Sequence, residues 1–516
     1  MKSIAPPIVI FAAIFILMAC DERSSGIPLE LHEIMLRNRT DSISMPLWPF
    51  DETEMAFLTP NLNVENDIRI AEIVRRQAAR IIVPTVPGVS PFAIQRISHL
   101  TSFIEHAKLV SEIYFMFDLL RYGYAGYQYF GGDDVFLPLR KSMLEKLEGL
   151  PNPLRVSSYL TDILVPPLRD VIADNHFMVH DRRMEAPRYT LFMNEDFVIR
   201  NTRNGFMTEV DNSAHKILEI TARDGQPIEG ILPTLTAQGE FAWTFGLMAS
   251  VSDFNAREMT VSFEDAITGE RHSRTVHLRR IDPLPRRTAT LLSQRKIAGV
   301  TVLEHTYGFS YAPEVLAEFF YSGDSMRNKS LFVLDLQGHR GGFRSLRHEW
   351  LRGYAGEDSV NILALNEFGL VTFTSMELHR VPPDAVQRFV DETEIAPPDW
   401  ILPTVPPNQI IPNENLVIVL MDNETSSLGE MFVAHLRQLE NVLFVGANTR
   451  GAIAFTSIVR TVMPYSELDI MFGTTLNLRP NLSQLEGVGF MPDLWVPPGE
   501  SLERVLRFIE RYGLAR

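Results

Sequence analysis

Short apolar runs alternate with helical segments from residue 298 to the end of the chain. The runs KSLFVLDLQG, NLVIVLMD and NVLFVG predict buried strands, and APEVLAEFFYSG, FRSLRHEWLRGYAG and SLGEMFVAHLRQLE predict the helices between them. Such alternation is typical of βαβ units, in which helices connect the strands of a sheet and cover it. This part of the chain therefore predicts an α/β core at residues 291–516.

Two regions of different character precede that core. Residues 61–185 carry apolar side chains at helical spacing and predict a helical region. Residues 186–290 read as short alternating runs separated by turn residues, which predicts a small β-rich domain. Within it, ILEITARDGQPIEGILPTL resembles the strand, turn and helix of a PDZ domain. A chain of 516 residues is long enough for several domains, so the predicted fold class is α+β and multidomain.

Charge and composition exclude several functions. The formal net charge of −16 argues against a nucleic-acid groove and against a polybasic membrane patch. The single cysteine excludes an internal disulfide and a cysteine-based metal site, and the histidines are not spaced as zinc ligands. We therefore expect neither a metal nor an organic cofactor.

The N-terminus is typical of a secretion signal. Lys2 precedes an apolar stretch at 8–18, which is too short to span a membrane comfortably. The stretch ends in LMAC, which resembles the lipobox of bacterial lipoproteins. That resemblance implies a signal peptide at 1–19, lipidation of Cys20, a tether at 20–60 and a body held outside the cytoplasm on a bacterial membrane. The alternative is an ordinary signal peptide with a chance cysteine.

Ser427 stands where a predicted strand gives way to a predicted helix. Ser427-Leu428-Gly429-Glu430 has the S-x-x-E pattern of a capping box, in which Glu430 reaches back to the Ser427 amide. A strand-to-helix turn also exposes a nucleophile beside free helix amides, and the amide of Leu428 is then a natural oxyanion donor. The local pattern alone favours the cap and leaves the nucleophile open.

A second turn at a strand end contains paired glycines. The run LFVLDLQGHRGGFRS predicts a buried strand, then Gly341 and Gly342, then a helix. Glycines let a backbone approach a ligand closely and turn its amides towards it. The pair is either a second source of oxyanion donors or a plain left-handed turn.

Four motifs in sequence order resemble the S41 peptidase family of C-terminal processing, tail-specific and tricorn-like proteases. LDLQGHRGG resembles its D-L-R-x-N-x-G-G turn, and VLMDNETSSLGEMFVAHL resembles its T-x-S-x-x-E nucleophile segment. VLFVGANTRGA and LEGVGFMPDLWV resemble the strand that follows and the closing E-G-x-G-x-x-P-D motif. The resemblance covers about residues 300–498. It implies a ClpP/crotonase-like core, Ser427 as nucleophile, and oxyanion donors at Gly341, Gly342 and Leu428.

The resemblance also implies which residue acts as the base. One branch of the family uses a lysine near the third motif, but the chain has no lysine after Lys329. The tricorn-like branch uses a histidine, which here matches His176, with a supporting glutamate that matches Glu486. Asn175 stands where that branch has a serine. His180 is a rival for the base.

The activity that this resemblance implies is hydrolysis of peptide bonds in peptide or protein substrates through an acyl-enzyme. Three departures from the family pattern, at Asn175, Gln337 and His339, leave a second interpretation open. In that alternative the chain is a weak or inactive relative that binds peptides or serves as a scaffold.

Overall fold

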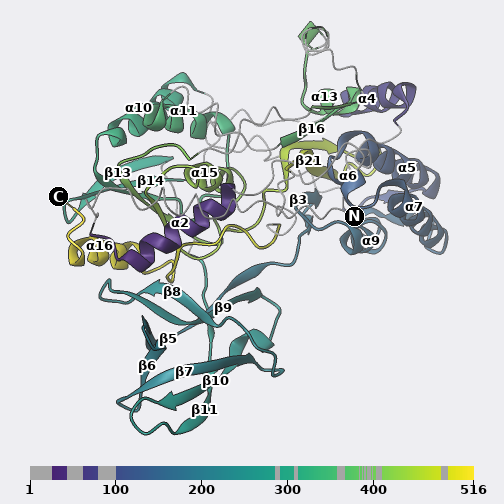
Figure 1. Ribbon diagram of the computed structural model, residues 1–516. Helices are drawn as coiled ribbons and strands as arrows, with labels where there is room; N and C mark the ends of the chain where they lie inside the picture. The colour runs from purple at the N-terminus through teal and green to yellow at the C-terminus, as the bar shows by residue number, and fades with distance from the viewer. Residues whose placement is uncertain are drawn as a thin grey trace, which may run out of the picture.

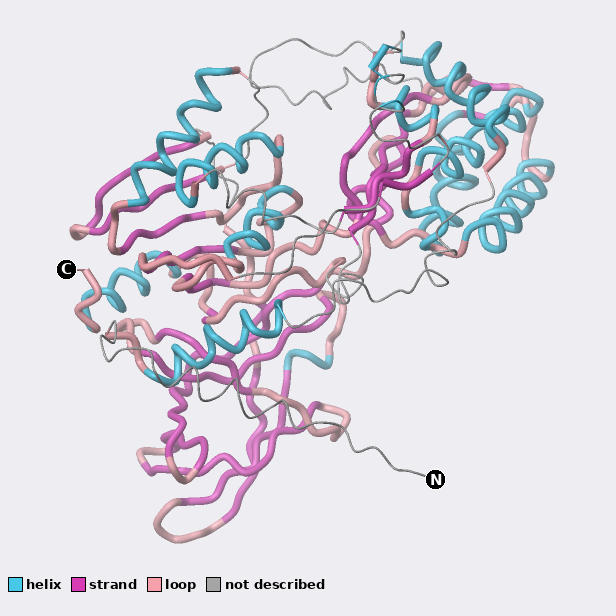
Figure 2. The backbone as a smooth tube through the Cα atoms, turned by 45° about the horizontal axis from the view of Figure 1, so that its top comes forward, coloured by secondary structure: helices cyan, strands magenta, loops and turns pink. Residues whose placement is uncertain are grey.

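The computed structural model describes three parts: an α/β core, a helical lobe and a β domain (Figure 1, Figure 2). Among the described residues no helix is long and apolar enough to cross a membrane. The predicted signal peptide at 1–19 and the lipidation site Cys20 lie outside the described residues. The structure describes residues 26–43, 62–78, 100–284, 291–306, 312–356, 367–382, several positions between 384 and 401, 410–477 and 486–515.

The core is built on a six-stranded sheet. Its first strand is antiparallel to the second, and the other neighbours pair in parallel. Three central strands, β15, β18 and β19, are buried at every position, which explains why the sequence reads as continuous apolar runs there. The strands in spatial order are β13 (Leu292–Ile297), β14 (Val300–His305), β15 (Leu331–Asp335), β18 (Leu416–Met421), β19 (Val442–Gly446) and β22 (Leu494–Trp495).

Helices cover both faces of this sheet, as the alternating pattern predicted (Figure 1). One face carries α10 (Pro313–Arg327), α11 (Arg344–Ala355) and α15 (Leu428–Leu436). The other carries α16 (Ser501–Arg511) and α2 (Leu29–Ile43). The position of α2 differs from the expected tether, because its buried Leu31 and Met35 lie one helical turn apart and pack on the core.

The helical lobe is not formed by residues 61–185 alone. Its helices pack on a second sheet whose strands come from both 174–184 and 367–477, so both stretches share one hydrophobic core. In spatial order that sheet contains β17 (Asp399–Ile401), β16 (Glu367–Val371), β21 (Asp469–Asn477), β3 (Asp174–Val179) and β4 (Arg182–Met184), with β20 (Phe455–Val462) paired to β21. The helices are α4 (Val64–Ala78), α5 (His106–Gly123), α6 (Gly126–Tyr129), α7 (Gly132–Glu148), α8 (Val156–Ser158), α9 (Val165–Val171) and α13 (Phe373–Leu378), with a π-helical turn at Tyr159–Leu164 and the short strands β1 (Phe103–Ile104) and β2 (Leu154–Arg155).

Residues 186–284 form a β domain, as predicted, but they do not form the helix that the PDZ resemblance implied. The expected helix after the turn is strand β8, which pairs with β9, and Pro233 within it disfavours a helix interior. Within 186–284 the one helical element is a 3₁₀ turn at Asn255–Arg257. The strands are antiparallel: β5 (Tyr189–Thr202), β6 (Gly205–Val210), β7 (Ser213–Ala222), β8 (Ile231–Leu235), β9 (Phe241–Ser250), β10 (Glu258–Asp265), β11 (Arg271–His277) and β12 (Arg279–Arg280).

Candidate active site

Hydrogen bonds to one aspartate, Asp422, hold the loop between β18 and α15 in place. The Oδ1 atom of Asp422 accepts hydrogen bonds from the amides of Thr425 at 3.0 Å and of Gly338 at 2.9 Å. The hydroxyl of Thr425 donates to the carbonyl of Leu336 at 2.9 Å. Because Leu336 and Gly338 follow β15, these bonds join the ends of two neighbouring parallel strands. They hold the loop of Ser427 against the glycine turn.

Ser427 has a backbone conformation that serine rarely adopts. Its φ is 54° and its ψ is −117°, at the junction where α15 begins. Such a conformation costs about 1–3 kcal/mol and persists where the surroundings enforce it, often at functional sites. Along 416–436 every residue is buried except Ser427, which is half-buried. The turn therefore presents one serine to the outside of an otherwise buried segment.

Glu430 binds the start of its own helix and the next loop with one carboxylate. Its Oε2 accepts from the amide of Ser427 at 3.0 Å and from that of Ala452 at 2.7 Å. Its Oε1 accepts from the amide of Gly451 and from the hydroxyl of Thr449, each at 2.7 Å. Burial raises the pKa of Glu430, whereas these four donors favour its charged form. The predicted contact from Glu430 to Ser427 is confirmed, and the same side chain also fixes the loop after β19.

The glycine turn lies directly against Ser427. A Cβ added to Gly341 would sit 3.2 Å from the Cβ of Ser427, 3.5 Å from its Oγ and 3.8 Å from the amide nitrogen of Leu428. The φ angles of Gly341 and Gly342 are 118° and 151°, which favour glycine. However, the amide of Gly341 donates to the Nδ1 of His339 at 3.2 Å. Of the three predicted oxyanion donors, the Gly341 amide is thus engaged elsewhere in this arrangement.

Two departures from the resembled motif have local roles in this turn. Gln337 is buried, and its side-chain amide donates to the carbonyl of Pro498 at 3.0 Å. His339 is buried too, and its carbonyl accepts from the amide of Ser426 at 2.9 Å. Its ring stacks on that of His305, with the centroids 5.2 Å apart. Both side chains therefore hold the turn in place beneath Gly341.

Glu486 lies in a second group of residues, on the side of the helical lobe. Its Oε1 accepts from the amide of Asn175 at 2.8 Å, and its Oε2 accepts from the amides of Ile453 at 3.2 Å and Ala454 at 3.0 Å. Burial and the nearby carboxyl of Asp174 raise the pKa of Glu486 well above its usual range. Within the described residues no hydrogen bond joins Glu486 to the ring of His176. Its contacts are those of a residue that holds backbone in place.

His176 lies in strand β3. Its amide donates to Asp174 at 2.7 Å, and the other oxygen of that carboxyl accepts from Tyr124 at 2.9 Å. Its Nδ1 is buried without a hydrogen-bond partner among the described residues. Burial lowers the pKa of His176 to about 4, and the positive charges of Arg183 and Arg450 act in the same direction. The imidazole is therefore neutral at pH 7.

The rival histidine is already engaged. The Nδ1 of His180 lies 3.0 Å from the Oδ1 of Asp469. The other oxygen of Asp469 accepts from the Nε of Arg460 at 2.9 Å. This arrangement makes His180 part of an ion cluster on the second sheet, so His176 is the better candidate for a base.

One loop, residues 449–455, connects the group around Ser427 with the group around His176. Glu430 binds its first half and Glu486 its second half, while the side chain of Asn175 donates to the carbonyl of Gly451. Among the described residues no hydrogen bond joins Ser427 to His176. The structure therefore places the predicted residues on two sides of one loop without closing the contact between serine and histidine.

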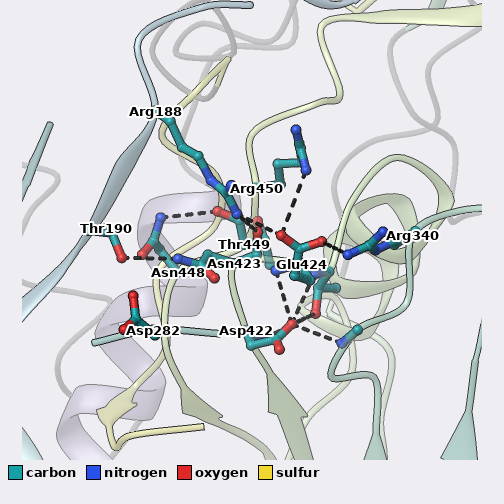
Figure 3. A network of polar contacts seen from close by, with 12 residues as sticks. Arg188, Thr190, Asp282, Arg340, Asp422, Asn423, Glu424, Asn448, Thr449 and Arg450 are labelled. Atoms are coloured by element: carbon teal, nitrogen blue, oxygen red, sulfur yellow. Dashed lines mark hydrogen bonds and ion pairs between the residues drawn. The ribbon is translucent and has the colours of Figure 1, made fainter. Parts of the chain in front are cut away.

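Several neighbours of these groups were not predicted from the sequence. Asp174 lies two residues before His176 in DNHF, so this neighbour could have been found from the local sequence. Glu424, three residues before Ser427 in the chain, forms a network with three arginines (Figure 3). The arginines are far apart in sequence, so no local pattern marks them. In the part of the chain that the structure describes, no histidine, cysteine, aspartate and glutamate side chains gather in a group that could hold a metal ion.

Comparisons with known proteins gave structural matches only. No family model matches the sequence, and no curated protein matches it. Mature CPAF is 14% identical at a TM-score of 0.38, with 79% of this chain and 96% of that chain covered. The photosystem II D1 C-terminal processing protease is 13% identical at a TM-score of 0.35, with 77% and 96% covered. The tricorn protease is 10% identical at a TM-score of 0.35, with 79% and 37% covered. At these identities and TM-scores, an argument about function has to come from this chain's own residues.

Replacing Glu430 with glutamine should destabilise the protein. The amide offers one acceptor oxygen and two donors where the carboxylate accepts four hydrogen bonds, so buried donors lose their acceptors. We expect Glu430→Gln to lower the free energy of unfolding by about 3 kcal/mol, measured by urea denaturation. Glu503→Gln, on the exposed side of α16, is the matched control and should change it by less than about 0.5 kcal/mol. Equal stability of both variants would contradict the role of Glu430.

His176 should stay neutral well below the usual range of histidine. NMR of ring-labelled protein should give a pKa of about 4, and Arg183→Gln should raise it because one repelling charge is lost. Arg182→Gln is the control, since Arg182 pairs with Asp181. Between pH 6.5 and about 4, His176 is protonated in the unfolded chain but neutral in the folded protein. This residue therefore lowers the free energy of unfolding as the pH falls through that window. An unshifted pKa in the wild type would contradict the burial described above.

Proposed function

We propose that this chain is a serine peptidase with Ser427 as its nucleophile. The observation that carries the proposal is the Ser427 turn, a strained and half-buried serine at a helix start, packed against Gly341. A cap alone would need neither the strain nor the glycine facing the serine side chain. This geometry suits a hydroxyl that has to be reached by a substrate carbonyl.

The proposed reaction proceeds through an acyl-enzyme. The Oγ of Ser427 attacks the peptide carbonyl carbon while neutral His176 accepts the hydroxyl proton. The amide of Leu428 and the Gly342 part of the turn stabilise the oxyanion. The carbon–nitrogen bond then breaks, and the leaving amine takes the proton from His176. Water, activated by the same base, hydrolyses the ester and releases Ser427.

The role of Glu486 changes in this proposal. Its oxygens accept from backbone amides, including that of Asn175, which is the neighbour of His176. We infer that Glu486 is a positioning residue, which holds the strand of the base and the connecting loop together. His176 then has to come within about 3 Å of the Ser427 Oγ when substrate binds, a tightening that catalytic contacts often show. The lipid anchor at Cys20 stays a prediction of the sequence.

A serine-reactive phosphonate tests the nucleophile. The wild-type protein should be labelled covalently, and Ser427→Ala should reduce the labelling rate at least about 100-fold because the attacking oxygen is lost. Ser426→Ala is the matched control, since Ser426 is buried and its bonds run through the backbone: its amide donates to the carbonyl of His339 and its carbonyl accepts from the amide of Gly429, each at 2.9 Å. That variant should keep its labelling.

Labelling that persists in Ser427→Ala would contradict the assignment of the nucleophile. A wild-type protein that is folded but resists labelling would contradict the peptidase proposal. That result would favour the peptide-binding or scaffold role that the sequence left open.

A further inference from the structure

Three arginines from separate segments converge on Glu424, in the loop that carries Ser427 (Figure 3). The Nη2 of Arg188 lies 2.9 Å from one carboxylate oxygen, and the Nη1 of Arg450 lies 3.8 Å from the same oxygen. Arg340 forms an ion pair with the other oxygen. We call Arg188, Arg340 and Arg450 the arginine cluster.

The charges around this cluster do not balance. Glu185 lies 3.0 Å from Arg450 and 4.0 Å from Arg183, so four guanidinium groups share two carboxylates and leave an excess of two positive charges. The pKa of Arg450 is lowered by burial and by the charge of Arg188. The chain as a whole carries −16, so this local excess is opposite to the overall charge.

The cluster keeps donors that its own carboxylates do not use. A guanidinium has five N–H donors, whereas Arg340 is bound to Glu424 through one nitrogen. The Nη2 of Arg188 also donates to the carbonyl of Asn423 at 2.9 Å, and its Nε is buried without a partner among the described residues. The side chains of Arg188 and Arg340 are 33% and 37% exposed, so a solute can reach them. Free forked donors of this kind match a carboxylate well.

The cluster also lies between the two halves of the candidate active site. Arg340 directly precedes Gly341, which faces Ser427. Arg450 directly precedes Gly451, whose amide is bound by Glu430. The charges of Arg450 and Arg183 reach His176, since both lower its pKa. A group that binds this cluster would therefore lie on the loops that carry Ser427, Gly341 and Gly451.

We propose that the arginine cluster is an anionic subsite that binds an acidic side chain of the peptide substrate close to the bond that is cut. This inference rests on the proposed peptidase function and adds the substrate class. If the cluster only clamped the loops together, a balanced set of charges would serve better, because uncompensated like charges repel one another. Glu424 holds the three guanidinium groups in place, and the remaining charge faces the substrate.

Paired peptides test the subsite. Fluorogenic peptides are compared in pairs that differ only by Glu or Gln at a single position. At one position near the cut bond, the Glu peptide should have a kcat/KM at least about 10-fold higher than the Gln peptide. Adding about 0.5 M NaCl should reduce this ratio by screening the charges. Arg340→Gln should reduce the Glu-to-Gln ratio to below about 3-fold. The ratio is measured within each variant, so a general loss of activity cancels. Arg279→Gln, in a surface pair of the β domain, is the matched control and should keep the preference.

Other outcomes separate this inference from the peptidase proposal. A wild-type protein that labels at Ser427 but shows no Glu preference would overturn the subsite alone. A preference for a free C-terminal carboxylate over its amide, without a Glu preference, would also overturn it. If the wild-type protein is not labelled, the binding of the same peptides to Ser427→Ala is measured by fluorescence anisotropy. Equal affinity for the Glu and Gln peptides would then overturn the subsite. Should Arg340→Gln fail to fold, Arg188→Gln repeats the comparison.

Discussion

The buried carboxylate of Glu430 is the contact on which the candidate active site depends. It accepts four hydrogen bonds, one from the start of its own helix and three from the loop at 449–452. A buried charge is stable only when such partners surround it, so neither the helix start nor the loop can move without a large cost. The strained conformation of Ser427 persists because its amide is held here and its loop is held by Asp422. A pattern that reads as an ordinary helix cap thus also positions Ser427, the proposed nucleophile.

A second carboxylate, that of Glu486, also accepts hydrogen bonds from backbone amides of the same loop, at its other end. Glu486 accepts hydrogen bonds from the amides of residues 453 and 454 and from that of Asn175, which precedes the proposed base His176. The loop therefore carries contacts from the α/β core at one end and from the helical lobe at the other. The proposed reaction of Ser427 with His176 as base would require the two parts to act together, and this loop is their shared boundary. The arginine cluster lies at the same boundary, where a substrate would meet both parts.

The core was predictable because its signals are local. Runs such as NLVIVLMD and NVLFVG become fully buried parallel strands, and the S-x-x-E pattern places Glu430 on the amide of Ser427. The second sheet was not predictable, because its strands come from 174–184 and 367–477 and are stabilised by pairing across a long sequence separation. The arginine cluster and the loop contacts of Glu486 also join distant segments, which a single sequence does not reveal.

The distance between the Oγ position of Ser427 and the ring nitrogens of His176 in a substrate-like state shows whether these two residues act as nucleophile and base. A crystal structure of the protein after covalent reaction with a peptide phosphonate at Ser427 would measure it. We expect a ring nitrogen within about 3 Å of that oxygen or of the phosphonate oxygen beside it. A histidine that stays more than about 6 Å away in the adduct, with the 449–455 loop ordered, would contradict the assignment of His176 as the base.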